Sequence, residues 1–362
     1  MHSDREIPPL REVIAHAWFT MGYPPARSLV LVCVESAASA GFVARVDLPL
    51  PQHRRAVAAM LASAAHRAGL RSVVVLVVLD PAGQAPPALD RVGATTVSAL
   101  RSRLRQAGVA VLDVAVVSAG HYRSMDCSDP ACCPPAGRPL GDLRETSTGA
   151  SMILRGRTVV DDEGGLVADV ARRAWPEEVE VPPGSGRPVD DLARWHEMVA
   201  VRVRAADGRP QPAPADVAWL VPALEDGRFR DAALVSLLPG GRSLARALAE
   251  GRITGVAQLG ACEQRSPDAD VFDAGRILLA AVARGAPEGR RAEALAVLAW
   301  MSWWQGVGAR SRLLAALALR DRPGHRLAGL VDTLLLHGVP PPWVRVDGAA
   351  NGEGVPSSES VT

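Results

Sequence analysis

The pattern of apolar and polar positions predicts alternating strands and helices in the first half of the chain. Residues 28–34 and 73–79 are almost continuously apolar and rich in β-branched side chains, as in strands that are buried on both faces. The other expected elements are strands at 42–48 and 109–117 and helices at 53–68 and 88–107. The resulting order, β-β-α-β-α-β, is typical of an α/β domain.

This order also predicts strand directions and the position of a site. Because crossover connections join parallel strands, we expect the second, third and fourth strands to run in one direction and the first to oppose them, in a mostly parallel sheet. The carboxyl ends of the three then meet at one edge, where open α/β sheets bind ligands. That edge would carry Asp47, Asp80 and the segment that begins at His121.

Beyond residue 174 the pattern becomes helical. Residues 175–189 form a linker rich in proline and glycine, and the polar residues 347–362 are expected to be a disordered tail. From 190 to 346 apolar residues recur at spacings of three and four, which predicts an all-α domain. The expected helices are 190–204, 215–225, 228–238, 242–250, 271–284, 291–305, 309–320 and 324–337. An α/β domain at 1–174 is therefore expected to precede a helical domain.

The composition is that of an ordinary globular protein. Apolar residues make up 48% of the 362 residues and charged residues 22%. A formal charge of +1 argues against nucleic acid as a partner, because phosphate backbones select strongly basic surfaces.

The absence of lysine and the near absence of asparagine exclude common reaction mechanisms. The chain contains no lysine, which excludes Schiff-base chemistry, anchoring of pyridoxal phosphate and the lysine of a phosphate-binding loop. Its one asparagine, Asn351, lies in the tail, so a Cys-His-Asn triad is also excluded.

The sequence carries no signal for secretion or membrane insertion. Acidic residues stand at the start, where a signal peptide needs a basic region followed by an apolar one. The longest apolar run, residues 73–79, is far shorter than the ~20 residues that span a bilayer. Five cysteines are an odd number and suit a reducing compartment, so we expect a cytoplasmic protein.

Residues 121–137, called the cysteine loop below, have the most unusual chemistry in the chain. Cys127, Cys132, Cys133 and His121 could supply the four ligands of a tetrahedral metal ion, and thiolates favour zinc. Two other interpretations remain open. The cysteines could fill gaps in a proline-stiffened loop, or form a reactive or redox pair whose thiol pKa is lowered by Arg123 or His121.

The aspartates at the sheet edge also have two interpretations. Asp47 and Asp80 could perform acid–base chemistry or hold a divalent ion, or could simply be turn residues beside prolines. Arg45 shares a strand face with Asp47, so the two could pair with each other. Alternatively, Arg45, Asp47 and Arg123 could hold an anion.

Several stretches of the chain resemble a known family. They are residues 21–30 (MGYPPARSLV), 44–49 (ARVDLP), 127–137 (CSDPACCPPAG), 298–300 (LAW) and 316–328 (ALALRDRPGHRLA). Together they resemble the domain of unknown function 4192 family of high-GC Gram-positive bacteria, whose most distinctive motif is the cysteine segment. The resemblance spans most of the chain and implies no particular activity.

Three classes of function follow. The first, which we favour, is a non-enzymatic binding or regulatory protein that holds a ligand or a metal at the sheet edge and docks a protein partner through its helices. The second is a hydrolase or transferase that uses Asp47, Asp80 and the cysteine loop. The third is a redox-responsive protein in which Cys127 pairs with Cys132 or Cys133. The first is favoured because no complete triad, four-ligand metal site or phosphate loop is evident.

Overall fold

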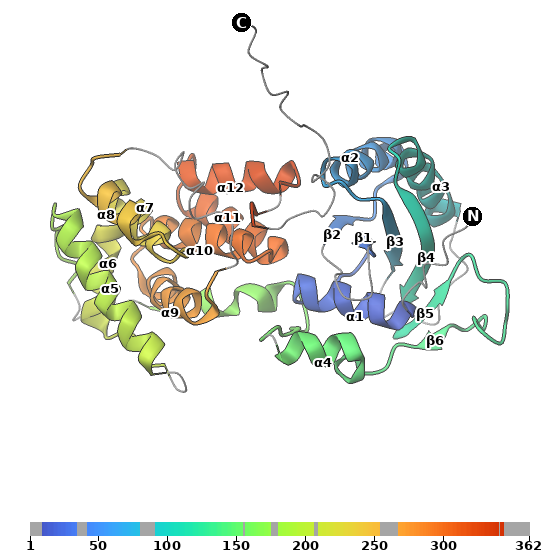
Figure 1. Ribbon diagram of the computed structural model, residues 1–362, viewed down its shortest axis with the longest axis horizontal. Coiled ribbons are helices and arrows are strands. Elements are labelled where there is room, and N and C mark those ends of the chain that lie inside the picture. The colour runs from blue at the N-terminus through green and yellow to red at the C-terminus, as the bar shows by residue number, and fades with distance from the viewer. Residues whose placement is uncertain are drawn as a thin grey trace, which may run out of the picture. The chain divides into compact units, whose positions relative to one another are not determined.

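The computed structural model describes residues 9–34, 42–79, 91–154, 156–174, 180–205, 209–253, 267–339 and 341–343 (Figure 1). The chain divides into two compact units. Among the described residues, one unit comprises those of 9–14 and 26–146 and contains the sheet, and the other comprises those of 15–25 and 147–343 and is helical. The division places residues 147–174 with the helices, earlier in the chain than the boundary expected from the pattern. Asp80 and the expected tail lie outside the described residues.

The sheet unit follows the expected alternation and adds two strands to it. Its strands are β1 (Ser28–Cys33), β2 (Val43–Asp47), β3 (Ser72–Val78), β4 (Ala110–Ser118), β5 (His121–Ser124) and β6 (Arg138–Pro139). Its helices are α2 (Arg54–Arg67) and α3 (Arg91–Gln106), with short 3₁₀ turns at Pro51–His53 and Leu143–Glu145. A further helix, α1 (Leu10–Met21), belongs in part to each unit.

The strands form one sheet in the order β2-β1-β3-β4-β5-β6. β1 is antiparallel to both β2 and β3, β3 is parallel to β4, and β5 is antiparallel to β4 and β6. The expected directions are therefore confirmed, because β2, β3 and β4 all run opposite to β1. The expectation of a mostly parallel sheet is wrong. Among the described strands only β3 and β4 pair in parallel, because β1 inserts between β2 and β3 and the β5–β6 hairpin extends the sheet beyond β4.

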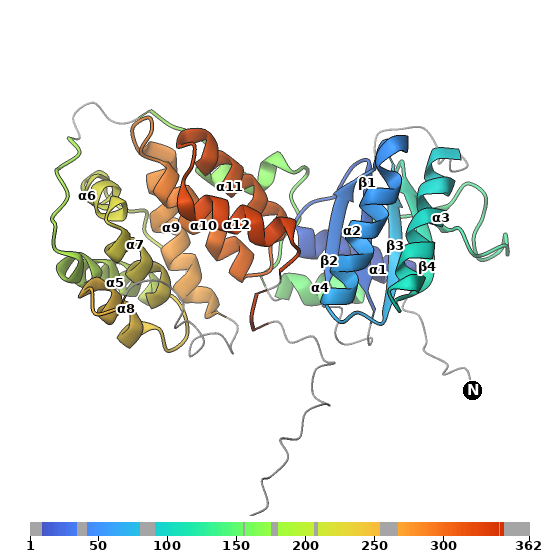
Figure 2. The same cartoon turned by 90° about the horizontal axis from the view of Figure 1, so that it is seen from above.

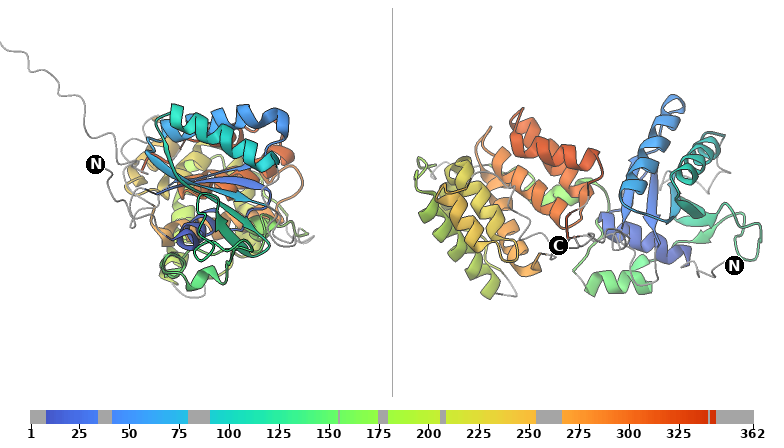
Figure 3. Two further views of the ribbon diagram at one scale, coloured as in Figure 1. Left: turned by 90° about the vertical axis from the view of Figure 1, so that its right-hand side faces the viewer. Right: turned by 45° about the horizontal axis from the view of Figure 1, so that its top comes forward.

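The core of this unit forms where α2 and α3 cover one face of the sheet (Figure 2 and Figure 3). Every residue of β1 and β3 is buried, as their unbroken apolar runs predict. Alternate residues of the strands face the two helices, which contribute one buried stripe each. This core includes Leu29, Leu31, Val73, Val75, Leu61, Ala65, Leu100 and Leu104. The sheet is thus a rigid base for the loops at its edges.

The second unit is a helical array with its own core. Its helices are α4 (Ser147–Leu154), α5 (Pro188–Arg204), α6 (Pro214–Glu225), α7 (Gly227–Ser236), α8 (Arg242–Ala249), α9 (Ala269–Gly285), α10 (Ala292–Trp304), α11 (Gly308–Asp321) and α12 (Arg326–Leu336), with a 3₁₀ helix at Gly164–Val170. All thirteen residues of α10 are buried, which makes it the central helix of this core. None of the described helices is both long and apolar enough to cross a membrane.

Candidate functional site

The expected edge of the sheet exists, but its polar residues are spread along it. Asp47 of β2 lies opposite Ser28, and His121 of β5 lies opposite Ser118, at the same edge. β1, β3 and β4 stand between these two strands. Four inter-strand spacings of about 4.8 Å separate Asp47 from His121 by about 19 Å, which is too far for one small ligand. Asp80 lies outside the described residues.

Arg45 is held within the β1–β2 pair. Its Nη2 lies 2.6 Å from Asp47 Oδ1, and its Nε donates to Ser28 Oγ at 3.0 Å. The pairing of Arg45 with Asp47 is one of the two alternatives that their spacing predicts. Arg123 lies on β5, four strands away, so the structure does not assemble an anion site from these three residues.

Cys127, Cys132 and Cys133 do come together, in the part of the cysteine loop that connects β5 to β6. Their three sulfur atoms lie within 4.8 Å of one another. All three thiols are free; Cys127 and Cys133 are half-buried and Cys132 is exposed. In the described part of the chain, no other group of three or more His, Cys, Asp or Glu residues comes together in this way.

His121 is not a member of this group. Its Nδ1 donates to the backbone carbonyl of Ala119 at 2.9 Å, which orients the ring at the start of β5. The four-residue set expected from the sequence is therefore present as three thiols, and the fourth coordination position of a tetrahedral ion would be open to water or another ligand.

Hydrogen bonds to Ser124 fix the first half of the loop to the sheet. Ser124 Oγ donates to Asp113 Oδ1 on β4 at 2.6 Å. The same oxygen accepts the backbone N–H groups of Asp126 and Cys127 at 3.0 and 3.1 Å. Arg101 on α3 binds both oxygens of Asp126, at 2.7 and 2.5 Å. The first cysteine is thus positioned by both the sheet and a helix.

The second half of the loop is shaped by its own backbone. Asp129 Oδ1 accepts the N–H of Ala131 at 2.8 Å, and the Asp129 carbonyl accepts the N–H of Cys133 at 2.7 Å. Arg138 on β6 donates from Nε to the Cys132 carbonyl at 2.5 Å. These contacts fold the chain back so that Cys132 and Cys133 face Cys127.

The loop returns to the sheet at Gly137, where only glycine fits without strain. Its φ is +78°, and a Cβ placed there would lie 3.2 Å from both the Cβ of His121 and the carbonyl oxygen of Tyr122. The close approach allows β6 to pair with β5 directly after the cysteines.

The two neighbouring thiols oppose the ionisation of Cys132. Hydrogen bonds with Cys127 and Cys133, together with their negative charge when ionised, raise the pKa of the Cys132 thiol. Below the loop, burial raises the pKa of Asp113, and the hydrogen bonds from Ser124 and the backbone of Val114 offset part of that rise. Three adjacent thiolates are unfavourable by themselves, and a cation bound among them removes the repulsion.

Three sulfur atoms at this spacing match the needs of a soft metal ion. With Zn–S bonds of ~2.3 Å, tetrahedral coordination places sulfurs ~3.8 Å apart. The sulfurs of Cys127, Cys132 and Cys133, which lie within 4.8 Å of one another, would have to approach by at most ~1 Å to reach that spacing. An exposed loop can make such a movement.

Several supporting residues were not identified from the sequence. Ser124 precedes two residues whose backbone N–H groups it accepts, a local pattern that Ser commonly forms, and this was a usable signal. Asp113 interrupts an otherwise apolar strand, which was a second signal. Arg138 carries no such signal in the sequence, because its hydrogen bond to the Cys132 carbonyl depends on how the loop folds back.

Comparison with protein families gives one match, to a family described as Domain of unknown function (DUF4192), over residues 11–342. No curated protein and no solved structure matches the chain in the corresponding comparisons.

Proposed function

Because this chain belongs to the domain of unknown function 4192 family, whose description names no activity, its function has to be inferred from the site, and we propose that it is a zinc-binding, non-enzymatic regulatory protein. Cys127, Cys132 and Cys133 are the ligands, and the sheet unit is the scaffold that holds them. The observation that carries this proposal is the approach of three free thiols to within 4.8 Å.

The donor set favours zinc over harder ions. Thiolates prefer zinc, copper(I) and iron–sulfur clusters, whereas magnesium and calcium prefer oxygen ligands. Asp126 could have supplied oxygen, but Arg101 occupies its carboxylate. A fourth ligand from water or from a regulatory partner would complete the coordination.

The arrangement gives less support to the hydrolase hypothesis. Catalysis by Asp47 and Cys127 requires both to touch one substrate. Asp47 ends β2, whereas Cys127 follows β5 at the other side of the sheet. We therefore assign Asp47 to the ion pair with Arg45.

The metal content of untagged protein tests the proposal. We expect about one zinc per chain by elemental analysis, and loss of that zinc in Cys132→Ser, because two thiolates bind far more weakly than three. Cys33→Ala is the matched control, since Cys33 is a buried thiol of β1 outside the cluster, and it should retain the metal. Less than a tenth of a zinc per chain in the wild type would refute the proposal.

The redox alternative predicts a different result in the same samples. A disulfide between Cys127 and either Cys132 or Cys133 would consume two of the free thiols on mild treatment with peroxide. If that loss occurs in protein that binds no zinc, the cluster functions as a redox pair; if added zinc protects all three thiols, it is a metal site.

A further inference from the structure

The helical unit contains a cleft that the proposed metal site does not use. Its volume is about 800 Å³, within the ~300–1,000 Å³ of typical small-molecule pockets. The end of α1, residues 156–169, the start of α9, the α10–α11 connection and Trp343 line it. All of these segments belong to the helical unit.

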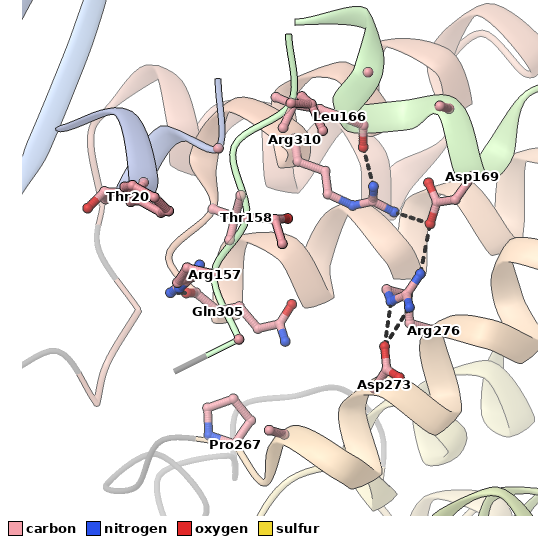
Figure 4. A pocket seen from close by; sticks show the side chains of 18 of the residues that line it. Thr20, Arg157, Thr158, Leu166, Asp169, Pro267, Asp273, Arg276, Gln305 and Arg310 are labelled. Carbon is pink, nitrogen blue, oxygen red and sulfur yellow. Dashed lines mark hydrogen bonds and ion pairs between the residues drawn. The ribbon is translucent and has the colours of Figure 1, made fainter. Parts of the chain in front are cut away.

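One wall of the cleft is a chain of ion pairs in which the charges are balanced (Figure 4). Its members are Arg209, Arg276 and Arg310 with Asp169, Asp270 and Asp273. Asp169 Oδ2 accepts from Arg276 at 3.0 Å and from Arg310 at 2.9 Å. Burial alone would raise the pKa of Asp169, but these two arginines outweigh it and lower that pKa. The wall therefore offers no spare positive charge.

Arg157 is the fourth arginine of the cleft, and it differs from the other three. Its Nη2 donates to the backbone carbonyl of Gln305 at 3.0 Å. Among the residues that the structure describes, no carboxylate lies within ion-pairing distance of Arg157. Burial lowers the pKa of its guanidinium, with no acidic neighbour to offset the effect. A partly desolvated guanidinium without a counterion is costly, and an anion that pairs with it is correspondingly favoured.

The surroundings of Arg157 combine hydroxyl groups with apolar surface. Thr20 and Thr158 both line the cleft, and Figure 4 shows Gln305 beside Arg157, with the side chain of Thr158 on the other side of the backbone, toward the chain of ion pairs. Phe19, Val307 and Trp343 add apolar lining to the same cleft. Such a mixture suits a ligand with one charged end and an organic body.

We propose that this cleft binds a small organic anion, whose carboxylate or phosphate group pairs with Arg157 and whose apolar body lies against Val307 and Trp343. Four arginines and three aspartates line the cleft, so one positive charge remains for the ligand. The planar guanidinium suits either oxyanion, because it donates two parallel hydrogen bonds.

Calorimetric titration of the full-length protein at low salt tests this proposal. The probes are benzoate and phenyl phosphate, with uncharged benzamide as the neutral match. We expect at least one of the anions to bind with one site per chain and benzamide to bind at least tenfold more weakly. The anion that binds identifies the oxyanion class.

Variants separate the site from general effects of charge. Arg157→Gln should weaken binding of the anion at least tenfold, whereas Arg326→Gln, at an exposed arginine of α12, should leave it unchanged. If Arg157→Gln does not fold, Val307→Asp provides a second test, because it adds a carboxylate to the lining at the N-cap of α11, with an expected loss of at least tenfold. Cys132→Ser should bind the anion normally, because the metal site is independent of this cleft. The proposal is wrong if neither anion binds, or if the folded Arg157 or Val307 variant binds as well as the wild type.

Discussion

Gly137 shows how one residue determines the path of the cysteine loop. Its positive φ and the 3.2 Å approach to His121 and Tyr122 are both needed for β6 to form after the cysteines. The residue is conformational support for the thiols and does not itself touch a ligand.

Gly137→Ala is expected to destabilise the sheet unit by about 1–3 kcal/mol, because alanine is strained at this φ and crowds β5. Urea denaturation followed by circular dichroism measures the loss, and zinc affinity should fall with it. Gly120→Ala is an informative control: its φ is also positive, at +72°, but nothing lies within 4 Å of its Cβ position. If both variants lose the same free energy of unfolding, crowding at Gly137 is unimportant.

The raised pKa of Cys132 predicts a pH dependence of metal binding. At neutral pH the thiol is protonated, so zinc must displace a proton when it binds. Affinity should therefore rise with pH as long as the Cys132 thiol is protonated in the free protein. Competition with a zinc indicator between pH 6 and 8 should show this rise together with release of the Cys132 proton. Affinity that does not change over this range would exclude thiolate ligation.

Ser124 shows how the local support of the loop depends on β4 and β5 together. Its hydroxyl joins Asp113 to the N–H groups of Asp126 and Cys127. Ser124→Ala leaves these partners unsatisfied, so we expect a loss of about 1–3 kcal/mol in stability and weaker zinc binding. Ser63→Ala, at an exposed serine of α2, should change neither the stability nor the zinc affinity. Unchanged zinc affinity in Ser124→Ala would show that the cysteines do not need this anchor.

In the helical unit, α7, α10 and the turn between α11 and α12 meet at a buried carboxylate. Glu293 accepts from Arg230 and Arg322 at 3.0 and 2.6 Å, and its other contact is His325 at 3.0 Å. Burial would raise the pKa of Glu293, but His325 and Arg230 outweigh it and lower the pKa to about 2.

This lowered pKa predicts the acid sensitivity of the helices. The stabilisation by Glu293 is complete above pH 4.5, its ordinary pKa, and is lost as the pH falls through about 2, with a total of about 3 kcal/mol. Glu293→Gln should cost about 3–5 kcal/mol at pH 7, because it leaves buried arginine charge unpaired, and the deficit should shrink between pH 4.5 and 2. Urea titrations of the wild type and the variant between pH 7 and 2 measure this deficit in the free energy of unfolding. Glu225→Gln, at a more exposed pair with Arg290, should cost less than about 1 kcal/mol at any pH.

Some elements could be predicted from the sequence because their signals are local. The valine-rich runs of β1 and β3 identify buried strands, and the concentration of three cysteines within residues 121–137 indicates a shared site. Sheet order could not be predicted in the same way, since β1 could pair with either neighbour on the basis of its composition. β6 has only two residues, Arg138 and Pro139, and depends on β5 for its formation.

The cleft in the helical unit illustrates the limit of such reasoning. The four arginines of the cleft come from distant parts of the sequence. Nothing in their local context distinguishes Arg157, the one that has no acidic partner among the described residues. That distinction depends on tertiary packing alone. The acidic residues that neutralise the other three arginines are equally inconspicuous in the sequence.

Removal of zinc should affect the two units differently. If Cys127, Cys132 and Cys133 bind zinc as proposed, chelation should speed amide hydrogen exchange in the cysteine loop, because the ion would connect the loop's two halves. Exchange in α10, which lies in the other unit, should not change. Mass spectrometry of peptic fragments resolves the two regions. Faster exchange in both, or in neither, would contradict a local structural role for the metal.

The two units alternate along the sequence, which limits how the gene can recombine. Residues 15–25 belong to the helical unit. The sheet unit follows them in the sequence, at residues 26–146, and the rest of the helical unit begins only at residue 147. Trp18, Phe19 and Tyr23 in that short segment are buried. A gene fragment cut at residue 147 would therefore separate the later helices from aromatic side chains that belong with them. A single crossover between two such genes cannot exchange either unit intact, so we expect the sheet unit and the helical unit to be inherited together.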